Sequence, residues 1–415
     1  WYHTPMDEKL QRKLRRLGVV KGFHDLKPPR PPQTRPTPAA DPAPLPGKEI
    51  STPYGTIWVA EAWYPGEHRH GCHALLDLDD LDPEIVQLLG ECEVGERPAF
   101  LDTETTGLAG GTGTLLFLTG VGVWESEGLR MHQVFLREPG EERAAMHYLN
   151  DLLDGVTGLV TFNGGPFDLP LLETRFVLQR LPPRWRTLPH LDLLVTARLL
   201  WREHLPSRRL VHLETSLLEV QRTRDDLPSW MIPEAYRAFL RTGETGEMAR
   251  IFYHNLVDIL SLATLLCYQA RLVVAPEALP REATEWVGLG RLYERAGRAA
   301  EAEAAWQRAL EEDTLPPDLA ARLWRELGQR HKRAEDWEAA FSVWEAWVER
   351  LPWAVEPLVE RAKYYEWVAK DIAAALAETE QALQRAARFS RRLYNGREIA
   401  ELRHRHQRLL RKNEG

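Results

Sequence analysis

Two carboxylates stand one residue apart in an apolar segment of this 415-residue chain: Asp102 and Glu104, in PAFLDTET. In a β-strand, side chains alternate between faces, so both acids point to the same side of a sheet. Carboxylates held that close repel each other unless a cation neutralises them, and Mg²⁺ or Mn²⁺ prefers such oxygen ligands. The pair therefore predicts a metal site. The alternative, two solvated acids on an edge strand, is disfavoured by the apolar residues before Asp102.

A second acid, Asp168, follows the apolar segment LVTF and the turn Asn163-Gly164-Gly165. We expect a strand to end at this turn and a helix to start near Phe167. Asp168 then lies in the first helical turn, beyond the end of the strand. Taken alone, Asp168 is better explained as an N-terminal charge that interacts with the helix dipole.

A third acid lies in ARIFYHNLVDILSLATLL, an apolar segment with helical periodicity. His254 and Asp258 stand four residues apart, so they share one helix face and interrupt a stripe that we expect to be buried. A buried Asp needs a partner, and a metal ion supplies one. A lone His on such a face is more often a satisfied core histidine, but this one lies one turn from a candidate ligand.

The three segments FLDTETTG, TFNGGPFD and HNLVD, in this order and at these separations, resemble the three motifs of the DEDD superfamily of 3′-to-5′ exonucleases. With the segments GLAGGTGT and HLDLL and the helical repeats that follow, the chain is similar to the YprB-like group of bacterial ribonuclease-H-like proteins. The resemblance covers about residues 60 to 275 and, more loosely, the repeats. Three ordered motifs are a specific signal, whereas an Asp-x-Glu pair alone is weak.

The resemblance implies an α/β ribonuclease-H-like domain, a mixed sheet with flanking helices, that hydrolyses phosphodiester bonds of single-stranded DNA or RNA ends. Its cofactors would be two divalent cations, Mg²⁺ or Mn²⁺. The residues that match the four metal-binding acids are Asp102, Glu104, Asp168 and Asp258. His254 matches the general base or water-orienting group of the third motif. Its four-residue spacing to Asp258 is typical of the tyrosine subclass, so Tyr253, at the five-residue spacing of the histidine subclass, stays an alternative.

Substrate contacts are expected around these acids. Asn163 and the two glycines after it would sit where the nucleotide backbone approaches, and Phe167 could stack on a base, although a packed core aromatic is the safer interpretation. Thr103, Thr105 and Arg175 complete the expected substrate-binding set.

The chain divides into five expected parts. They are a basic helical segment (1–27), a proline-rich linker (28–48), a small strand-rich lead-in (49–96), the ribonuclease-H-like domain (97–275) and C-terminal helical repeats (282–412). Within the domain, three apolar runs with short connections predict an antiparallel meander, followed by a helix, a fourth strand and mostly helical sequence. The lead-in is not predicted to be an independent domain.

The C-terminal region repeats a pattern of Trp, Leu, Gly and Ala at an offset of 38 residues, for example from Trp286 to Trp324 and from Gly290 to Gly328, and a looser third copy follows. This spacing resembles tetratricopeptide-like (TPR-like) all-α repeats, in which small residues let helices approach and aromatic residues fill the gaps. The alternative is a plain helical bundle. Either way the region is expected to be a scaffold, which could recruit a protein partner.

Charge and composition bound the remaining properties. The net charge of −8 argues against a protein that coats nucleic acid by bulk electrostatics, but residues 175–224 hold ten Arg or Lys against four Asp or Glu. That basic band could face a phosphate backbone or be a solvated surface. Three widely spaced cysteines fit a reducing, cytoplasmic compartment, and no long apolar run predicts a membrane span. Because residue 1 is Trp rather than Met, a lost leader segment stays open.

Other signals are weaker. GLAGGTGT lacks a lysine and precedes a strand, so we expect a hairpin beside the site rather than a nucleotide-binding loop. The spacing of HRHGCH matches no familiar closed metal site. In HLDLL, His190 and Asp192 could line the site, or Asp192 could cap a helix. Asp102 and Glu104 are too close for a glycosidase pair. The competing function is a catalytically weak nucleic-acid-binding adaptor whose repeats recruit a partner, but four acids would repel a polyanion without metal.

Overall fold

A computed structural model describes most of residues 44–414. Outside the described residues are 1–43, 80, 91, 108–112, 126, 224–225, 278–281, 390–395 and 415. The predicted basic segment, most of the proline-rich linker and the centre of the glycine-rich loop GLAGGTGT therefore lie outside the described residues.

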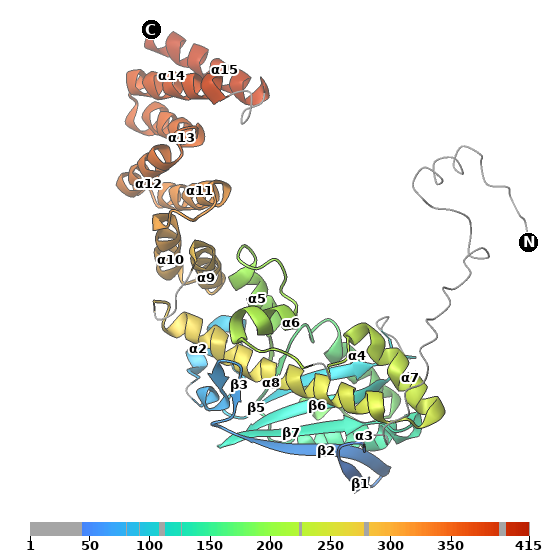
Figure 1. Ribbon diagram of the computed structural model, residues 1–415. Helices are drawn as coiled ribbons and strands as arrows, with labels where there is room; N and C mark the ends of the chain where they lie inside the picture. The colour runs from blue at the N-terminus through green and yellow to red at the C-terminus, as the bar shows by residue number, and fades with distance from the viewer. Residues whose placement is uncertain are drawn as a thin grey trace, which may run out of the picture. The chain divides into compact units, whose positions relative to one another are not determined.

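One mixed sheet of seven strands is the centre of the fold (Figure 1). Its strands in sheet order are β1 (Lys48–Thr52), β2 (Gly55–Pro65), β7 (Gly128–Phe135), β6 (Leu116–Glu125), β5 (Pro98–Thr105), β8 (Gly158–Thr161) and β9 (His190–Asp192). Neighbours from β1 to β5 are antiparallel, and β8 and β9 add in parallel. The predicted meander, helix and fourth strand are confirmed as β5, β6, β7, the helix α3 and β8.

The helices surround and follow this sheet. They are α2 (Pro83–Gly90), α3 (Glu142–Leu152), α4 (Asp168–Leu178), α5 (Leu193–Trp201), α6 (Leu210–Leu213), α7 (Ile232–Thr242), α8 (Gly246–Val274), α9 (Ala283–Arg295), α10 (Ala299–Glu311), α11 (Pro317–Arg333), α12 (Trp337–Arg350), α13 (Glu356–Tyr364), α14 (Ile372–Phe389) and α15 (Gly396–Asn413). The element order confirms the predicted fold class, an α/β domain followed by an all-α region.

The strand-rich lead-in is part of the same sheet. β2 pairs along eight residues with β7, from Trp58 opposite Phe135 to Pro65 opposite Gly128, and β1 pairs with β2. The short hairpin of β3 (Arg69–His70) and β4 (His73–Ala74) then leads toward α2. Residues 48–65 therefore extend the meander of the following segment, and the expected boundary near residue 97 does not divide the sheet.

Helix α8 lies across β5 and β6 and orients the candidate site (Figure 1). Two glycines of β6 allow this close approach. A Cβ atom at Gly120 would lie 2.2 Å from the Asn255 Oδ1 atom, and a Cβ atom at Gly122 would lie 2.7 Å from the Ile259 Cγ2 atom. A larger residue at either position would force α8 away from the sheet.

Among the described residues, α8 is the one helix that is long and apolar enough to cross a membrane by length and composition. Its most apolar 18-residue window is 78% buried inside the protein. Since the helix is covered by β5 and β6 on one side and by α5 and α2 elsewhere, it is a core helix that is apolar on nearly every face.

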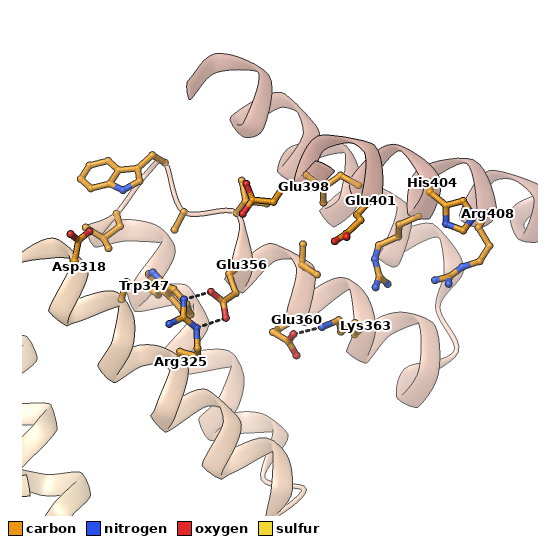
Figure 2. A pocket seen from close by; sticks show the side chains of 18 residues that line it. Asp318, Arg325, Trp347, Glu356, Glu360, Lys363, Glu398, Glu401, His404 and Arg408 are labelled. Carbon is orange, nitrogen blue, oxygen red and sulfur yellow. Dashed lines mark hydrogen bonds and ion pairs between the residues drawn. The ribbon is translucent and has the colours of Figure 1, made fainter. Parts of the chain in front are cut away.

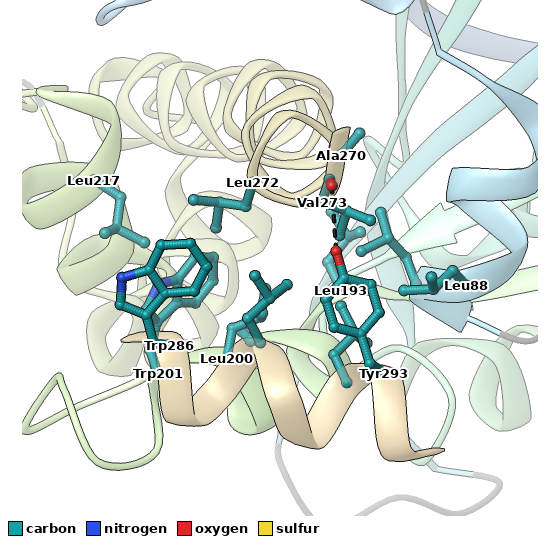
Figure 3. Close-up of a cluster of buried hydrophobic side chains, with 14 of the residues drawn as sticks. Leu88, Leu193, Leu200, Trp201, Leu217, Ala270, Leu272, Val273, Trp286 and Tyr293 are labelled. Atoms are coloured by element: carbon teal, nitrogen blue, oxygen red, sulfur yellow. Dashed lines mark hydrogen bonds between the residues drawn. The ribbon is translucent and has the colours of Figure 1, made fainter. Parts of the chain in front are cut away.

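Helix α9 packs on α5 and on the end of α8 (Figure 3). Gly288 permits this contact, because a Cβ atom there would lie 1.9 Å from the Leu200 carbonyl oxygen. Trp286 and Trp201 join the same apolar cluster, and the Tyr293 hydroxyl donates to the Val273 carbonyl over 3.4 Å. The first C-terminal helix is thus continuous with the core of the α/β domain.

The C-terminal helices repeat one packing detail. A Cβ atom at Gly290 would lie 2.2 Å from the Trp306 indole nitrogen, and one at Gly328 would lie 2.6 Å from the Trp344 indole nitrogen. The glycine and the tryptophan are 16 residues apart in both pairs, and the pairs are offset by the 38 residues seen in the sequence. Small and large residues therefore interlock as the repeat pattern predicts, while the TPR-like assignment stays a prediction.

A cavity of about 690 Å³ lies among α11, α12, α13 and α15 (Figure 2). Several of its charged lining residues pair with each other: the Arg325 guanidinium donates two hydrogen bonds to Glu356, of 2.7 and 2.6 Å, and Lys363 pairs with Glu360. Trp347 and Leu351 give it an apolar side. The cavity belongs to the helical region and is not lined by any of the predicted site residues.

Candidate active site

The paired acids of β5 lie on the face of the sheet that α8 covers. Phe100 packs in the same apolar cluster as Ile259 of α8, and Asp102 and Glu104 follow Phe100 at alternate positions. Asp102 stands opposite Gly120 of β6, the position over which Asn255 packs. The pairing of β5 with β6 shifts register between Glu104 and the next residue, so the strand becomes irregular where the acids end.

Asn255 connects the third motif to the first. Its side-chain amide donates to the Asp102 Oδ2 atom over 2.8 Å. The amide of Gln133, on β7, in turn donates to the Asn255 Oδ1 atom over 3.0 Å and to the Phe252 carbonyl over 2.7 Å. Because its Oδ1 atom accepts from Gln133, Asn255 must turn its NH₂ group toward Asp102. This buried amide pair holds the Asp102 carboxylate in place.

Asp168 reaches the site from the start of α4. The Thr103 hydroxyl of β5 donates a short hydrogen bond to the Asp168 Oδ1 atom, which joins the second motif to the first. Asp192 fixes the loop before Asp168: its carboxylate accepts from the backbone N–H of Asn163 over 2.7 Å and from that of Gly165 over 3.4 Å. Thus Asp192 does more than cap a helix.

Both expected roles of Asp192 are in fact present. The same carboxylate accepts from the Leu194 N–H over 3.1 Å and is the N-cap of α5. Asn163 adopts a left-handed backbone conformation with φ of 65°. Such a conformation costs free energy for a residue other than glycine, and the hydrogen bond to Asp192 helps to maintain it.

His254 and Asp258 bring the third segment to Glu104. The His254 Nε2 atom lies 3.7 Å from the Glu104 Oε1 atom and 3.5 Å from the Asp258 Oδ2 atom. One ligand atom from each of the three residues lies within 4.8 Å of the others. The Glu104 and Asp258 side chains are 13% and 14% exposed, so the cluster is mostly buried yet open to solvent. Glu104 of the first motif and His254 and Asp258 of the third therefore meet at the end of β5, and Asp168 of the second is joined to that strand through Thr103.

Three charged residues that the sequence did not indicate complete the cluster. The Arg222 guanidinium pairs with Asp258 and donates to both oxygens of Glu214, over 2.7 and 2.6 Å. The Asp226 Oδ1 atom lies 2.7 Å from the His254 Nδ1 atom. Burial alone would lower the pKa of Arg222, but its hydrogen bonds and the charges of Asp258 and Glu214 raise it, so the guanidinium stays charged.

The acids interact strongly. Burial raises the pKa of Asp102 well above its ordinary value, and the charges of Asp258 and Asp168 raise it further. Burial, followed by the charge of Asp102, likewise raises the pKa of Glu104. Burial raises the pKa of Asp168 to about 6. The folded chain thus disfavours full ionisation of these carboxylates unless positive charge is added.

This donor set fits hard divalent cations. Asp102, Glu104, Asp168 and Asp258 offer carboxylate oxygens, which Mg²⁺ and Mn²⁺ prefer over softer ligands. Of the four acids, Arg222 hydrogen-bonds to Asp258, and within the described part of the chain no Arg or Lys hydrogen-bonds to Asp102 or Glu104. Added cations would offset the repulsion that raises the pKa values of these acids.

Four of the five predicted substrate-binding residues lie at or near the acids. Phe167 is 57% exposed beside Asp168, so the expectation of a packed core aromatic is wrong. Thr103 and Asn163 lie at the site but hydrogen-bond to Asp168 and Asp192. The Thr105 hydroxyl donates to the carbonyl of Gly107, within its own loop, over 3.0 Å.

Arg175 requires a correction. Its side chain is 5% exposed and forms a buried ion pair with Glu142 of α3, with a further hydrogen bond to the Thr114 carbonyl over 3.3 Å. A guanidinium held in this way fastens α4 to α3 and is not available to a substrate. The basic band of residues 175–224 is therefore not one continuous charged surface, because Arg222 also forms a buried ion pair.

The structure distinguishes Tyr253 from His254. The His254 imidazole is directed at Glu104 and Asp258, whereas the Tyr253 hydroxyl accepts from the Thr223 N–H over 3.3 Å. A helix separates consecutive side chains by about 100°. Tyr253 therefore belongs to the neighbouring face of α8.

The histidine-rich hairpin does not gather its imidazoles at one point. The His70 Nε2 atom lies 2.8 Å from the Ser261 hydroxyl, and the His73 Nδ1 atom lies 3.3 Å from an oxygen of Asp77. His68 contacts the ring of Tyr64 edge-on, with ring centroids 4.8 Å apart. Each of the three imidazoles therefore has a different partner.

Known proteins resemble this chain in sequence. Residues 99–269 match the family described as the RNase_H superfamily. A Bacillus subtilis (strain 168) protein named "Uncharacterized protein YprB" is 29% identical over 345 residues, which cover 80% of this chain and 81% of the relative. The match to the family includes the four acids and His254, and the mixed sheet with its helices agrees with the predicted fold. Residues 99–269 are therefore similar to the ribonuclease H superfamily, and the mixed sheet with its helices is consistent with a ribonuclease-H-like fold.

Proposed function

We propose that this protein is a metal-dependent nuclease, a 3′-to-5′ exonuclease that hydrolyses single-stranded DNA or RNA. The observation that supports it best is the convergence of carboxylates from three distant segments at one end of β5: Thr103 contacts Asp168, Asn255 contacts Asp102, and Glu104 lies near Asp258. The ribonuclease-H-superfamily domain favours a nuclease. Polarity, metal number and the DEDD mechanism are parts of the proposal.

The residues that would hold two divalent cations are Asp102, Glu104, Asp168 and Asp258. When bound, the cations supply a polarised water and neutralise charge on the scissile phosphate. Asn255 and Thr103 keep two of the carboxylates oriented, so their oxygens need little reorganisation when cations bind. Arg222 holds Asp258 on the other side of the cluster.

His254 is the proposed proton acceptor. The Nδ1 atom of His254 lies 2.7 Å from the Asp226 Oδ1 atom and 3.1 Å from the Arg222 guanidinium. In the tautomer that donates from Nδ1 to Asp226, which this proposal uses, the Nε2 atom presents a lone pair toward the acids. That atom can accept a proton from an attacking water. Tyr253, directed elsewhere, is not a proton acceptor in this proposal.

Phe167 is the proposed stacking residue for the terminal base. Its ring is exposed directly beside Asp168, and base stacking on an aromatic side chain is worth about 1–3 kcal/mol without requiring a particular base. Asn163 and Gly165 would lie along the substrate backbone, in the loop that Asp192 fixes. Single strands suit such a site, because a paired base could not stack on Phe167.

A second candidate is a catalytically weak binder whose helical region recruits a partner. One observation favours it: Arg222 already gives Asp258 a fixed positive neighbour, which reduces the need for metal at that acid. The cavity of the helical region between α11 and α15 would then be the partner site. The three cysteines, Cys72, Cys92 and Cys267, are all free, and we keep the reducing, cytoplasmic compartment as part of the proposal.

The test uses single-stranded DNA and RNA labelled at either the 5′ or the 3′ end, with Mn²⁺ or Mg²⁺. We expect a ladder from the 5′-labelled strand, immediate release of labelled mononucleotide from the 3′-labelled strand, and no cleavage of circular single strands. Asp102→Ala and Asp258→Ala should abolish all of this. Activity that survives both substitutions would reject the site, and tight binding without cleavage would favour the adaptor.

A further inference from the structure

A groove of about 370 Å³ lies beside the candidate active site, between the β3–β4 hairpin and α8. Tyr64, His68 and Arg69 line it from the side of the hairpin. Gln221 and Tyr253 line it from the other side. Residues 68–71 of the histidine-rich motif therefore form one wall of this groove.

The hairpin is built to stand at this position. Gly71, with φ of 63°, makes its turn, and a Cβ atom there would lie 1.8 Å from the Leu218 carbonyl oxygen. The same carbonyl accepts from the Cys72 N–H over 2.8 Å. No residue other than glycine fits at this turn without moving the hairpin away from residues 218–220.

The groove and the acid cluster are formed by neighbouring residues of the same chain segments. Tyr253 directly precedes His254, and Gln221 directly precedes Arg222, whose guanidinium contacts Asp258. From the hairpin, His70 reaches Ser261, three residues beyond Asp258 on α8. The groove and the acid cluster therefore share two supports, helix α8 and residues 219–222.

The chemistry of the lining fits a flat, uncharged ring. Leu256 and Leu260 of α8 provide an apolar surface, and Tyr64, His68 and Tyr253 provide rings. Burial lowers the pKa of His68 below its ordinary value, so its imidazole is neutral near pH 7. The charged side chains of the lining are one cation and one anion, Arg69 and Glu219, so the groove as a whole does not select a polyanion.

We propose that this groove binds an unpaired nucleobase of the substrate strand, close to the scissile phosphodiester. The proposal rests on the proposed nuclease function and names a base-binding subsite for it. A groove of about 370 Å³ is within the usual range for small organic ligands, about 300–1,000 Å³. Arg69, exposed at the rim, can then approach a neighbouring phosphate. Because the base must leave any duplex to enter, the groove contributes to a preference for single strands.

The experiment measures binding of fluorescent single-stranded oligonucleotides to the full chain by anisotropy, in an Asp102→Asn background that prevents cleavage. Single abasic sites are placed at each position in turn. We expect affinity to fall at least about fivefold at one or two positions near the 3′ end, the loss that corresponds to about 1 kcal/mol of stacking. His68→Ala removes a ring, and Gln221→Trp fills the groove; each should weaken the intact strand by a similar factor and abolish the effect of those abasic positions.

Matched controls are available on the exposed surface. His212→Ala and Gln307→Trp make the same chemical changes outside the groove and should leave binding as it is in the parent. Thermal unfolding confirms that each variant is folded. If the parent binds and cleaves while both groove variants give the same abasic profile as the parent, the groove proposal is wrong and the nuclease proposal stands. If the parent neither binds nor cleaves nucleic acid, both fail.

Discussion

The Nδ1 atom of His254 lies 2.7 Å from the Oδ1 atom of Asp226, and the opposite ring nitrogen faces Glu104 and Asp258. A carboxylate at one ring nitrogen selects the tautomer and fixes the plane of the imidazole. Among the described residues, the Asp226 carboxylate contacts His254 and, over 3.5 Å, Arg222, and it contacts none of the four acids proposed to hold metal. It is therefore a positioning residue for His254, linked to Asp258 only through Arg222.

Asp226→Asn keeps the size of the side chain but removes its charge. We expect kcat on single-stranded substrate to fall about 10- to 100-fold, a typical effect of removing a residue that orients a ligand or base, with little change in KM. Steady-state cleavage assays measure both. The control is Glu247→Gln, which neutralises an exposed acid in the first turn of α8. An unchanged kcat in Asp226→Asn would remove Asp226 from the mechanism.

Gly120 should tolerate no side chain. Gly120→Ala places a methyl group where the Asn255 amide lies, so either α8 shifts or the Asn255–Asp102 hydrogen bond breaks. Overpacking of this kind costs about 1–3 kcal/mol, and we expect a lower thermal midpoint together with weaker Mn²⁺ binding. Gly246→Ala, at a position of α8 with nothing within 4 Å, is the matched control. Equal Mn²⁺ affinity in both variants would contradict this account of Asn255.

The metal-free protein should lose stability as pH rises through the titration of Asp168. Its folded pKa of about 6 lies above the ordinary value of 3.8, so the folded state binds the proton more tightly. The contribution of this group to stability is complete below about pH 4 and is lost as pH rises through about 6. In EDTA, Asp168→Asn should therefore melt higher than the parent at pH 8 and equally at pH 4.

Adding Mg²⁺ at pH 8 should reverse that order, because the cation stabilises the ionised carboxylate and binds only the parent tightly. Thermal melts at the two pH values, with and without Mg²⁺, check the sign. A parent that is more stable than Asp168→Asn at pH 8 in EDTA would show that the acids do not repel each other in the folded chain.

Arg222 should matter for folding as well as for the site. Arg222→Met leaves Glu214, which is fully buried, without its cation, and breaking a buried pair costs about 3–5 kcal/mol. The double variant Arg222→Met, Glu214→Gln should recover part of this loss. Urea unfolding in EDTA measures all three proteins. A single variant as stable as the parent would mean that the Arg222–Glu214 pair contributes nothing.

The sequence predicted the acids and the histidine of the site better than the residues that hold them in place. Alternation placed Asp102 and Glu104 on one face, and the four-residue spacing placed His254 beside Asp258, because both inferences depend only on local geometry. The antiparallel meander and the repeated glycine and tryptophan pairs of the C-terminal helices were predictable because they too depend on local sequence patterns. Asp168, which alone was better explained as a helix-terminal charge, became a candidate only through its order among the motifs.

The supporting residues depend on contacts that no local pattern contains. Arg222 counted as one charge of a basic band, and nothing in its neighbours indicates the buried Glu214. Arg175 was expected at the substrate and instead fastens α4 to α3. Asn255 offered one signal: a polar side chain beside His254 on an apolar helix needs a partner, and its partner Gln133 lies 122 residues away.

The most direct test of the central claim is an anomalous diffraction experiment on crystals grown with Mn²⁺ and a phosphorothioate single strand that resists cleavage. The account predicts two manganese peaks within coordination distance of the carboxylates of Asp102, Glu104, Asp168 and Asp258, with the modified phosphate beside them and the Nε2 atom of His254 facing it. Crystals that bind the oligonucleotide elsewhere, or that show manganese only at other acids, would contradict it.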